Sequence, residues 1–178
     1  DTCVVARGEQ WTAGAARGQN YHNLSASAQW LHKLNRENSV YLNVSQSFVM
    51  PTFAQMYSDN AAQLPAPSLR PQKGINYEIG WKKNHDGHTW KAALFHIDIK
   101  DNITASVERG KTEYKYVNED FRNTGIELSD EIRGTHGLSY HWGVTWQNPQ
   151  TNNTDRPGGW YRTFGKGQLT GGVTYQKE

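Results

Sequence analysis

The fold of this chain is decided by residues 24–48, which read LSASAQWLHKLNRENSVYLNVSQSF. Polar and apolar residues alternate on both sides of a polar turn at residues 35–38. Side chains of a strand point to opposite faces in turn, so each half of this stretch has one apolar and one polar face. The apolar faces carry Leu24, Ala26, Ala28, Trp30, His32 and Leu34, then Val40, Leu42, Val44 and Phe48. This pattern predicts a β-hairpin.

Two environments fit such a hairpin. Each strand is about 10 residues long, which is the length that a tilted strand needs to cross a bilayer. A soluble β-sandwich also builds strands with one wet face and one buried face. Leu31 and Gln46 are the exceptions on the polar and apolar faces. The hairpin by itself leaves both alternatives open.

Composition narrows the classes of protein. The 178 residues carry 19 Lys and Arg against 17 Asp and Glu, a balance that does not suggest a nucleic-acid partner. No apolar run reaches the roughly 18 residues that a membrane-spanning helix requires. A barrel with a polar interior remains compatible with the mean hydropathy of −0.84 and the 12% aromatic content, because half of every strand is wet. Cys3 is the single cysteine, so no disulfide forms within the chain.

The same alternation recurs farther along the chain. Strands are predicted over residues 75–82, 89–103, 114–118, 126–133, 138–146 and 169–175. In the 89–103 strand both faces carry apolar residues, so the sequence does not decide which face meets an apolar environment. With the hairpin, this gives an all-β antiparallel sheet of about eight strands.

The lengths of the connections favour a membrane barrel. Short connections are predicted at residues 35–38, 84–87 and 134–137, and long ones at 51–72, 107–120 and 148–162. Four prolines make 51–72 an irregular loop, because proline cannot donate to a sheet ladder. Short and long connections alternate strictly, so they collect at opposite ends of the sheet. Transmembrane barrels have this arrangement, with short periplasmic turns and long extracellular loops.

Four sequence patches resemble a known family. They are VYLNVSQSF at 40–48 leading into Pro51-Thr52-Phe53, LRPQ at 69–72 with NYEIGW at 76–81, ALFHIDIKDNI at 93–103, and YVN at 116–118 with GIEL at 125–128. Together they are similar to the barrel segment of TonB-dependent outer-membrane receptors. The resemblance implies uptake of a scarce nutrient, most often a ferric siderophore, across the outer membrane of a Gram-negative bacterium. It also implies three partners: the chelate, outer-membrane lipid, and TonB acting through a plug domain.

This resemblance also sets the expected domain organisation. Barrels of this class have about 22 strands, so residues 1–178 are expected to be part of one barrel domain, with the plug domain and the remaining strands outside the sequence. Residues 1–5 lack the basic start and apolar core of a signal peptide. The chain is therefore expected to be an internal part of a longer receptor. The competing hypothesis is a soluble or surface-exposed β-sandwich that binds a ligand or a carbohydrate.

Candidate functional residues lie in the long loops. Aromatic and basic side chains there can bind an anionic chelate by stacking and charge, although packing of the loops explains the same residues equally well. The predicted ligand-binding set is Phe53, Tyr57, Arg70, Trp160, Tyr161 and Arg162. Ferric siderophores, heme and cobalamin are not distinguished by the sequence.

No catalytic or metal-binding pattern is found. The chain has no GxSxG nucleophile motif and no histidine pair at metal-ligand spacing, so we predict no enzyme, no cofactor and no metal site. The histidines at turns, such as His85, His88 and His136, are expected to be solvated. Glu127, Glu131 and Arg133 are expected to form part of a charge-compensated interior wall.

Several tryptophans have two possible roles. Trp30, Trp81, Trp90, Trp142 and Trp146 lie on the predicted strands, as the core of a sandwich or as an interfacial girdle. The positions of Trp81, Trp90 and Trp146 near strand ends favour the girdle, where an apolar ring and a wet N–H are both satisfied.

Overall fold

A computed structural model describes residues 2–7, 10–15, 25–58, 60–134, 137–152 and 159–176, the first two ranges as backbone only. Strands β1 (Thr2–Arg7) and β2 (Gln10–Ala15) pair with each other in a separate antiparallel sheet. The prediction for Leu24 and His136 lies outside the described residues.

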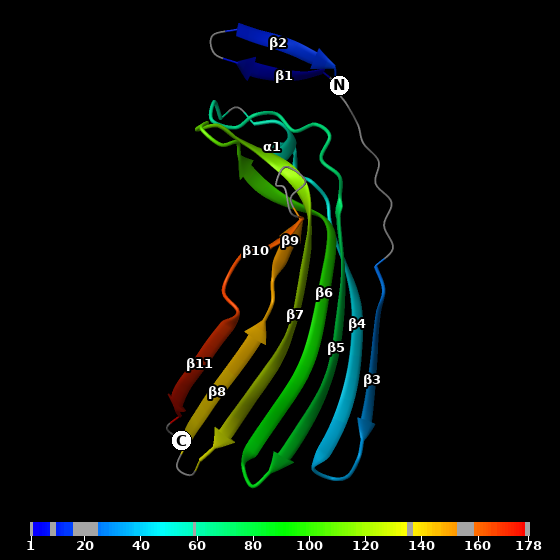
Figure 1. The fold of residues 1–178 in the computed structure, drawn as a ribbon, viewed down its shortest axis with the longest axis vertical. Coiled ribbons are helices and arrows are strands. Elements are labelled where there is room, and N and C mark those ends of the chain that lie inside the picture. The colour runs from blue at the N-terminus through cyan, green and yellow to red at the C-terminus, as the bar shows by residue number, and fades with distance from the viewer. Residues whose placement is uncertain are drawn as a thin grey trace.

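The main sheet has nine strands and is antiparallel throughout (Figure 1). Its members are β3 (Ser27–Lys33), β4 (Asn38–Val49), β5 (Gln72–His85), β6 (His88–Val107), β7 (Tyr114–Arg133), β8 (Leu138–Gln147), β9 (Gln150–Asn152), β10 (Trp160–Arg162) and β11 (Gly167–Tyr175). Strands β3 to β8 pair in chain order, and β11 pairs with β8. The prediction of an all-β antiparallel sheet is confirmed, with nine strands instead of about eight.

Strand β7 is long enough to hold two neighbours on one edge. Its second half pairs with β8 from Gly125 to Arg133, and its middle pairs with β9 from Asp120 to Arg122. The break between β8 and β9 falls at Pro149, which has no N–H to donate to the ladder. The long connection predicted at residues 148–162 was therefore wrong at 150–152 and at 160–162, which form β9 and β10.

The long loop predicted at residues 107–120 was also wrong. Strands β6 and β7 are 20 residues each, and the connection between them covers residues 108–113 only. The alternation is hidden in the sequence for two reasons. A register shift between Ile99 and Asn102 places Asp101 at a positive φ of 56°. Beyond that bulge, residues 102–107 of β6 still alternate between polar and apolar, but the facing residues 118–120 of β7 are polar on both faces.

The register defines two faces of the sheet. Residues that lie directly opposite in neighbouring strands point to the same face. One row runs across β3 to β8 through Trp30, Leu42, Ile79, Leu94, Ile126 and Trp146. We call the face with this row the outer face, and the face with Tyr41, Ala93 and Glu127 the inner face. The register also orients the strand predicted at residues 89–103, whose faces the sequence did not decide. Trp90, Ala92 and Leu94 lie on its outer face.

Apolar side chains of the outer face are exposed. Ile79 and Leu94 are each 56% exposed, although both sit in the middle of the sheet. Among the described side chains, the buried apolar residues other than proline and glycine are only Tyr41, Ala66, Leu69 and Ala93. A soluble sandwich would cover its apolar face with a second layer. The main sheet instead presents a continuous apolar surface outward.

The two ends of the main sheet differ, and we call them the turn end and the loop end. At the turn end, β5 and β6 are joined by Asp86 and Gly87, both at positive φ as a two-residue hairpin turn requires. At the loop end, residues 50–71 connect β4 to β5 and include the single helical turn α1 (Phe53–Met56). Among the described residues, no helix is long and apolar enough to cross a membrane.

Candidate ligand-binding site at the loop end

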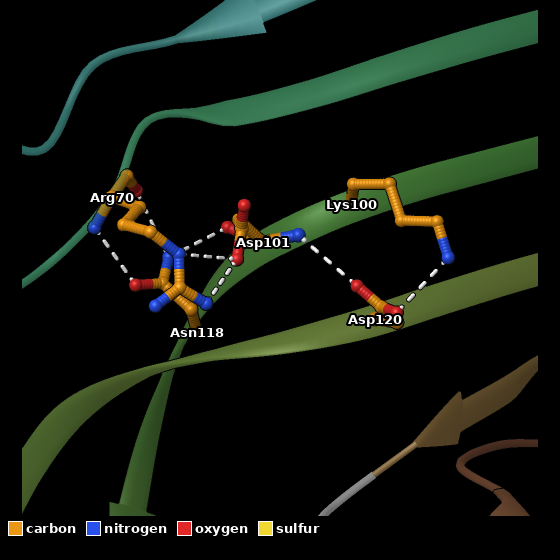
Figure 2. Close-up of polar contacts among 5 residues, drawn as sticks. All are labelled: Arg70, Lys100, Asp101, Asn118 and Asp120. Carbon is orange, nitrogen blue, oxygen red and sulfur yellow. Dashed lines mark hydrogen bonds and ion pairs between the residues drawn. The ribbon is translucent and has the colours of Figure 1, made fainter.

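Arg70 lies at the end of the 50–71 loop and is held by an aspartate of the neighbouring strand (Figure 2). Its Nε and Nη2 both donate to Oδ1 of Asp101, with Nε at 2.9 Å. The bond and the charge of the Asp101 carboxylate raise the pKa of the Arg70 guanidinium, so this group stays charged. The positive φ of Asp101 at the bulge is what turns its side chain toward the loop.

Asn118 completes this contact from β7. Its amide donates to the carbonyls of Arg70 and Asp101 at 2.9 and 2.8 Å, and its Oδ1 accepts from the backbone N–H of Arg70. On the other side of the bulge, Lys100 Nζ lies 3.0 Å from Oδ2 of Asp120 (Figure 2). We call Arg70, Asp101 and Asn118 the loop clamp, because they join the 50–71 loop to β6 and β7.

A second contact fixes the middle of the same loop. Tyr114, the first residue of β7, exchanges backbone hydrogen bonds with the loop at Ala62 and Leu64. The Tyr114 hydroxyl donates to Gln63 Oε1 at 3.1 Å, and Gln63 Nε2 donates to the carbonyl of Ala54 in α1. Gln63 is 8% exposed, so its amide is a buried group with both ends hydrogen-bonded. These contacts therefore fix the middle of the loop against β7.

Two predicted aromatic residues come together on α1. The rings of Phe53 and Tyr57 lie 5.4 Å apart at 39°. The turn that carries them is closed by a capping box, in which Thr52 and Gln55 bond each other's backbone N–H. Phe53 remains 60% exposed, so the pair can still contact a ligand.

The other predicted aromatic and basic residues are divided between the faces. Register with β9 places Trp160 and Arg162 on the outer face and Tyr161 on the inner face. The ring of Trp160 lies 4.1 Å from the guanidinium carbon of Arg122, which belongs to the same face. Arg70 is engaged in the loop clamp. The predicted set is thus divided between the loop clamp with Arg70, the α1 turn with Phe53 and Tyr57, and the two faces of β10.

The inner face is hollowed near Tyr161. This inner hollow has a volume of about 400 Å³. Its described polar lining residues are Asn102, Thr104, Ser106, Glu119, Thr151, Tyr161 and Thr163, and its aromatic ones are Phe121 and Phe164. The two phenyl rings stack at 6.2 Å and 19°. Hydroxyl and amide groups beside a stacked aromatic pair suit an organic ligand with hydrogen-bonding groups.

Sequence reasoning missed most of this hollow. Thr104 and Phe121 were assigned to no strand, because the bulge at Ile99 and Asn102 hides the continuation of β6 and β7. Phe164 lies between β10 and β11, with no local signal of its role. Residues 114–124 show no alternation of apolar and polar side chains that could have found it.

Nearer the turn end, the inner face carries a charged cluster. Lys91 Nζ lies 3.5 Å from Glu78 Oε1 and 3.8 Å from Glu127 Oε1, and the Tyr41 hydroxyl donates to Glu78. Arg133 pairs with Glu131 at 3.5 Å. The expected charge-compensated wall at Glu127, Glu131 and Arg133 is confirmed, with Lys91 as the counter-ion that was not foreseen.

The turn histidines and tryptophans follow the expected pattern only in part. His85 is exposed, whereas His88 is half-buried. Trp146 lies in the mid-sheet row of Leu94 and not at a strand-end girdle. His85 lies 2.9 Å from Glu37, and His88 lies 2.8 Å from Asp130. In the part of the chain that the structure describes, no three His, Cys, Asp or Glu side chains gather as a metal site. Trp81 donates its Nε1–H to Asn38 at 3.1 Å from the outer face, as a girdle residue does.

Comparison with known sequences agrees with this architecture. A sequence model of the family described as TonB dependent receptor-like, beta-barrel, matches residues 6–178. The chain belongs to the TonB-dependent receptor β-barrel family. The exposed apolar outer face is accordingly the lipid side of a transmembrane barrel wall, and the polar inner face lines its interior. The soluble-sandwich hypothesis is thereby excluded.

Solved structures show the same barrel wall. The ferripyoverdine receptor of the Pseudomonas aeruginosa outer membrane, bound to ferripyoverdine, gives a TM-score of 0.64 at 18% identity over 94% of this chain and 22% of its own. The copper transporter OprC gives 0.62 at 18% identity over 86% of this chain and 24% of its own. The FrpB iron transporter from Neisseria meningitidis gives 0.57 at 22% identity over 74% and 20%. No curated protein sequence matches.

These neighbours share the fold of a TonB-dependent barrel, and the family is one of receptors and transporters. This chain spans between about a fifth and a quarter of the three structures' own lengths. The 50–71 loop and the inner hollow both lie at the loop end of this barrel wall, and the tight hairpins lie at its turn end.

Proposed function

We propose that this chain is a wall segment of an outer-membrane receptor that takes up a ferric siderophore or a similar metal chelate in a Gram-negative bacterium. Family membership and the inner hollow at the loop end support this function. Neighbours described as an iron transporter, a copper transporter and a ferripyoverdine receptor support a metal or its chelate as cargo. Energy would come from TonB through a plug domain.

The inner hollow is the proposed contact with the chelate. Tyr161 and the stacked Phe121 and Phe164 provide flat apolar surface, and the threonine hydroxyls nearby provide hydrogen bonds. Phe53 and Tyr57 extend the aromatic surface from the ordered loop. Arg70 would act as a positioning residue that holds this loop, since its guanidinium is bonded to Asp101. Trp160 and Arg162 lie on the outer face, so they would not line this inner hollow.

Uptake by the full-length receptor tests this function. A strain that lacks the receptor gene, and is complemented with it, should accumulate radioactive iron from at least one ferric siderophore of a chemically diverse panel. The accumulation should disappear when TonB is deleted. Uptake that continues without TonB, or no uptake from any chelate of the panel, would contradict the proposal.

The contact surface is tested by paired variants. Tyr161→Ala with Phe164→Ala removes two aromatic rings of the inner hollow, and chelate binding by the purified receptor should weaken about tenfold or more, since stacked aromatic pairs contribute beyond their buried area. Replacement of residues 84–87 with another tight turn is the matched control and should leave affinity unchanged. If the turn replacement weakened chelate binding and the double ring variant did not, the ligand would bind at the turn end and the proposal would fail.

A further inference from the structure

Basic residues are concentrated on the outer face beyond its apolar surface. Two neighbouring rows of the register cross β4, β5, β6, β7, β9 and β10 at the loop end. Their charged members are Lys73, Lys100, Arg122 and Arg162 against Asp98 and Asp120. This stretch of the lipid side therefore carries an excess of positive charge.

The inner face has no such charge in the same part of the sheet. Two inner rows interleave with these outer rows, running from Ser45 and Ser47 on β4 to Phe121 and Thr151. In their described members there is no Lys, Arg, Asp or Glu. The basic residues are thus placed on the face that turns toward the membrane and away from the barrel interior, where a ligand for transport would pass.

Each strand changes from apolar to charged over a short distance. On β5, the outer face passes from Ile79, Tyr77 and Ile75 directly to Lys73. On β6, it passes from Leu94 through His96 to Asp98 and Lys100. Lipid headgroups lie at the boundary where the apolar surface of a membrane protein ends. The basic residues of these strands are therefore at headgroup depth.

A hollow lies at this boundary. It has a volume of about 600 Å³, and its lining includes Gln46, Lys73, Tyr77, His96, Asp98 and Lys100. All six belong to the outer face by register. We call it the outer hollow. Tyr77 and His96 form its apolar side, with rings 6.4 Å apart, and Lys73, Lys100 and Asp98 form its polar side.

The two lysines of the outer hollow outnumber its one carboxylate, Asp98, and suit a phosphate group. Lys73 is exposed and Lys100 is 58% exposed at its side chain, so both ammonium groups can reach a ligand. Asp120 already holds one hydrogen bond of Lys100, which orients the lysine and leaves two of its three N–H donors for other acceptors. Gln46 adds a neutral donor and acceptor beside them.

We propose that the outer hollow binds the phosphate-bearing headgroup of an anionic lipid in the leaflet at the loop end. The headgroup phosphate lies between Lys73 and Lys100, and its acyl chains extend over the apolar surface that begins at Tyr77 and continues through Ile79 and Leu94. Basic pockets at a membrane border bind phosphorylated headgroups in this way. This lipid site is separate from the inner hollow and does not depend on which chelate the receptor carries.

Native mass spectrometry of the full-length receptor tests the lipid site. The receptor is titrated with a bis-phosphorylated glucosamine lipid, with phosphatidylglycerol, and with phosphatidylcholine as the lipid of no net charge. Lys73→Gln and Lys100→Gln should each weaken binding of the bis-phosphorylated lipid about fivefold, and together about 25-fold, because one basic side chain near a membrane surface contributes about 1 kcal/mol. Binding of phosphatidylcholine should not change.

Lys82→Gln is the matched control, since Lys82 is an exposed lysine on the inner face of β5. It should bind the anionic lipid as the unchanged receptor does. Wild-type affinity in the Lys73→Gln, Lys100→Gln double variant would overturn the proposal, as would an equal loss in Lys82→Gln. Inorganic phosphate that displaces the lipid at millimolar concentration would also overturn it, by showing that free phosphate alone occupies the site. Chelate uptake in the double variant reports separately on the transport function.

Discussion

The membrane-crossing part of the sheet and its loop end are stabilised in different ways. In the crossing part, strands β4 to β8 hold each other by backbone ladders, and the environment on each face selects the side chains, apolar outside and polar inside. At the loop end, individual side chains join separate segments, as Arg70, Asp101 and Asn118 do. A substitution in the crossing part should change the stability of the receptor, because the new side chain meets lipid or a packed neighbour. A substitution at the loop end should affect only the one contact that the side chain makes.

The largest effect is expected where a charge is placed in lipid. Val144 lies on the outer face of β8, opposite Leu128 and Leu169, and Thr145 is its neighbour on the inner face, opposite Glu127. Val144→Arg should destabilise the full-length receptor by about 2–4 kcal/mol, the cost of arginine near the bilayer midplane. Reversible unfolding in lipid vesicles with guanidinium chloride measures this cost.

Thr145→Arg is the control, because its guanidinium points inward beside the Glu127 carboxylate. It should cost less than about 1 kcal/mol, the range of an ordinary exposed ion pair. Equal costs at the two positions would mean that both faces are buried alike, and the distinction between the faces would fail. Trp142→Arg should fall between them, because Trp142 lies opposite Asp130 on the outer face.

A smaller effect is expected from packing on the inner face. Gly80 lies under the ring of Tyr41, and a Cβ at this position would lie 2.4 Å from the ring atoms. The Tyr41 hydroxyl is bonded to Glu78, so the ring cannot move away without breaking that bond. Gly80→Ala should therefore cost about 1–3 kcal/mol, as overpacking does. The same unfolding measurement applies.

Gly171→Ala is the matched variant on β11. A Cβ there would meet only the His141 carbonyl oxygen, at an ordinary contact distance of 3.7 Å. It should leave the stability within about 0.5 kcal/mol, as most exposed substitutions do. If Gly80→Ala proved equally neutral, the ring of Tyr41 would not be fixed by Glu78.

The same distinction explains how far the sequence could be read. In the crossing part, lipid on one side and water on the other impose a period of two, so the strands around Leu42, Ile79 and Trp142 were predicted with their faces. The hairpin turn at Asp86 and Gly87 was also visible, because two residues at positive φ favour this pair. Only the 89–103 strand, apolar on both faces, required the register to orient it.

At the loop end the physical signal is lost. Both faces of β6 and β7 meet polar surroundings there, so Thr104 and Lys115 are as compatible with a loop as with a strand. Arg70 was read as a ligand residue because the sequence shows its charge and not its partner, Asp101, which lies 31 positions away. The residues of the inner hollow come from three distant segments. Their proximity is a result of strand pairing that no local pattern contains.

Removal of the loop clamp should have a local effect. Arg70 is 66% exposed at its side chain, so its ion pair with Asp101 is largely screened by solvent. Arg70→Ala should change the global stability by about 1 kcal/mol or less.

The 50–71 loop should nevertheless become more accessible in the Arg70→Ala variant, and limited proteolysis of the full-length receptor should cut this loop several times faster. Arg109→Ala, at an exposed position in the 108–113 connection, should leave the rate unchanged. An unchanged rate in Arg70→Ala would show that Tyr114 and Gln63 alone fix the loop.

The smallest effect is expected at the tip of the long β6–β7 hairpin, where Lys111 Nζ lies 2.7 Å from Glu108 Oε2. This hydrogen bond and the charge of Lys111 hold the pKa of the Glu108 carboxyl below its ordinary value. Any stabilisation from the pair is present above the ordinary pKa of glutamate and is lost as the pH falls through the lowered one. Lys111→Ala should return the pKa of Glu108 upward to its ordinary value, which the carboxyl carbon shift of a labelled receptor reports by NMR. Lys115→Ala, which removes a more distant charge, should move the pKa of Glu108 less.

Because both groups of the pair are exposed, the unfolding transition of the Lys111→Ala receptor should stay in place. A shifted transition would mean that the hairpin tip is coupled to the crossing strands, and that the two regions are not stabilised independently.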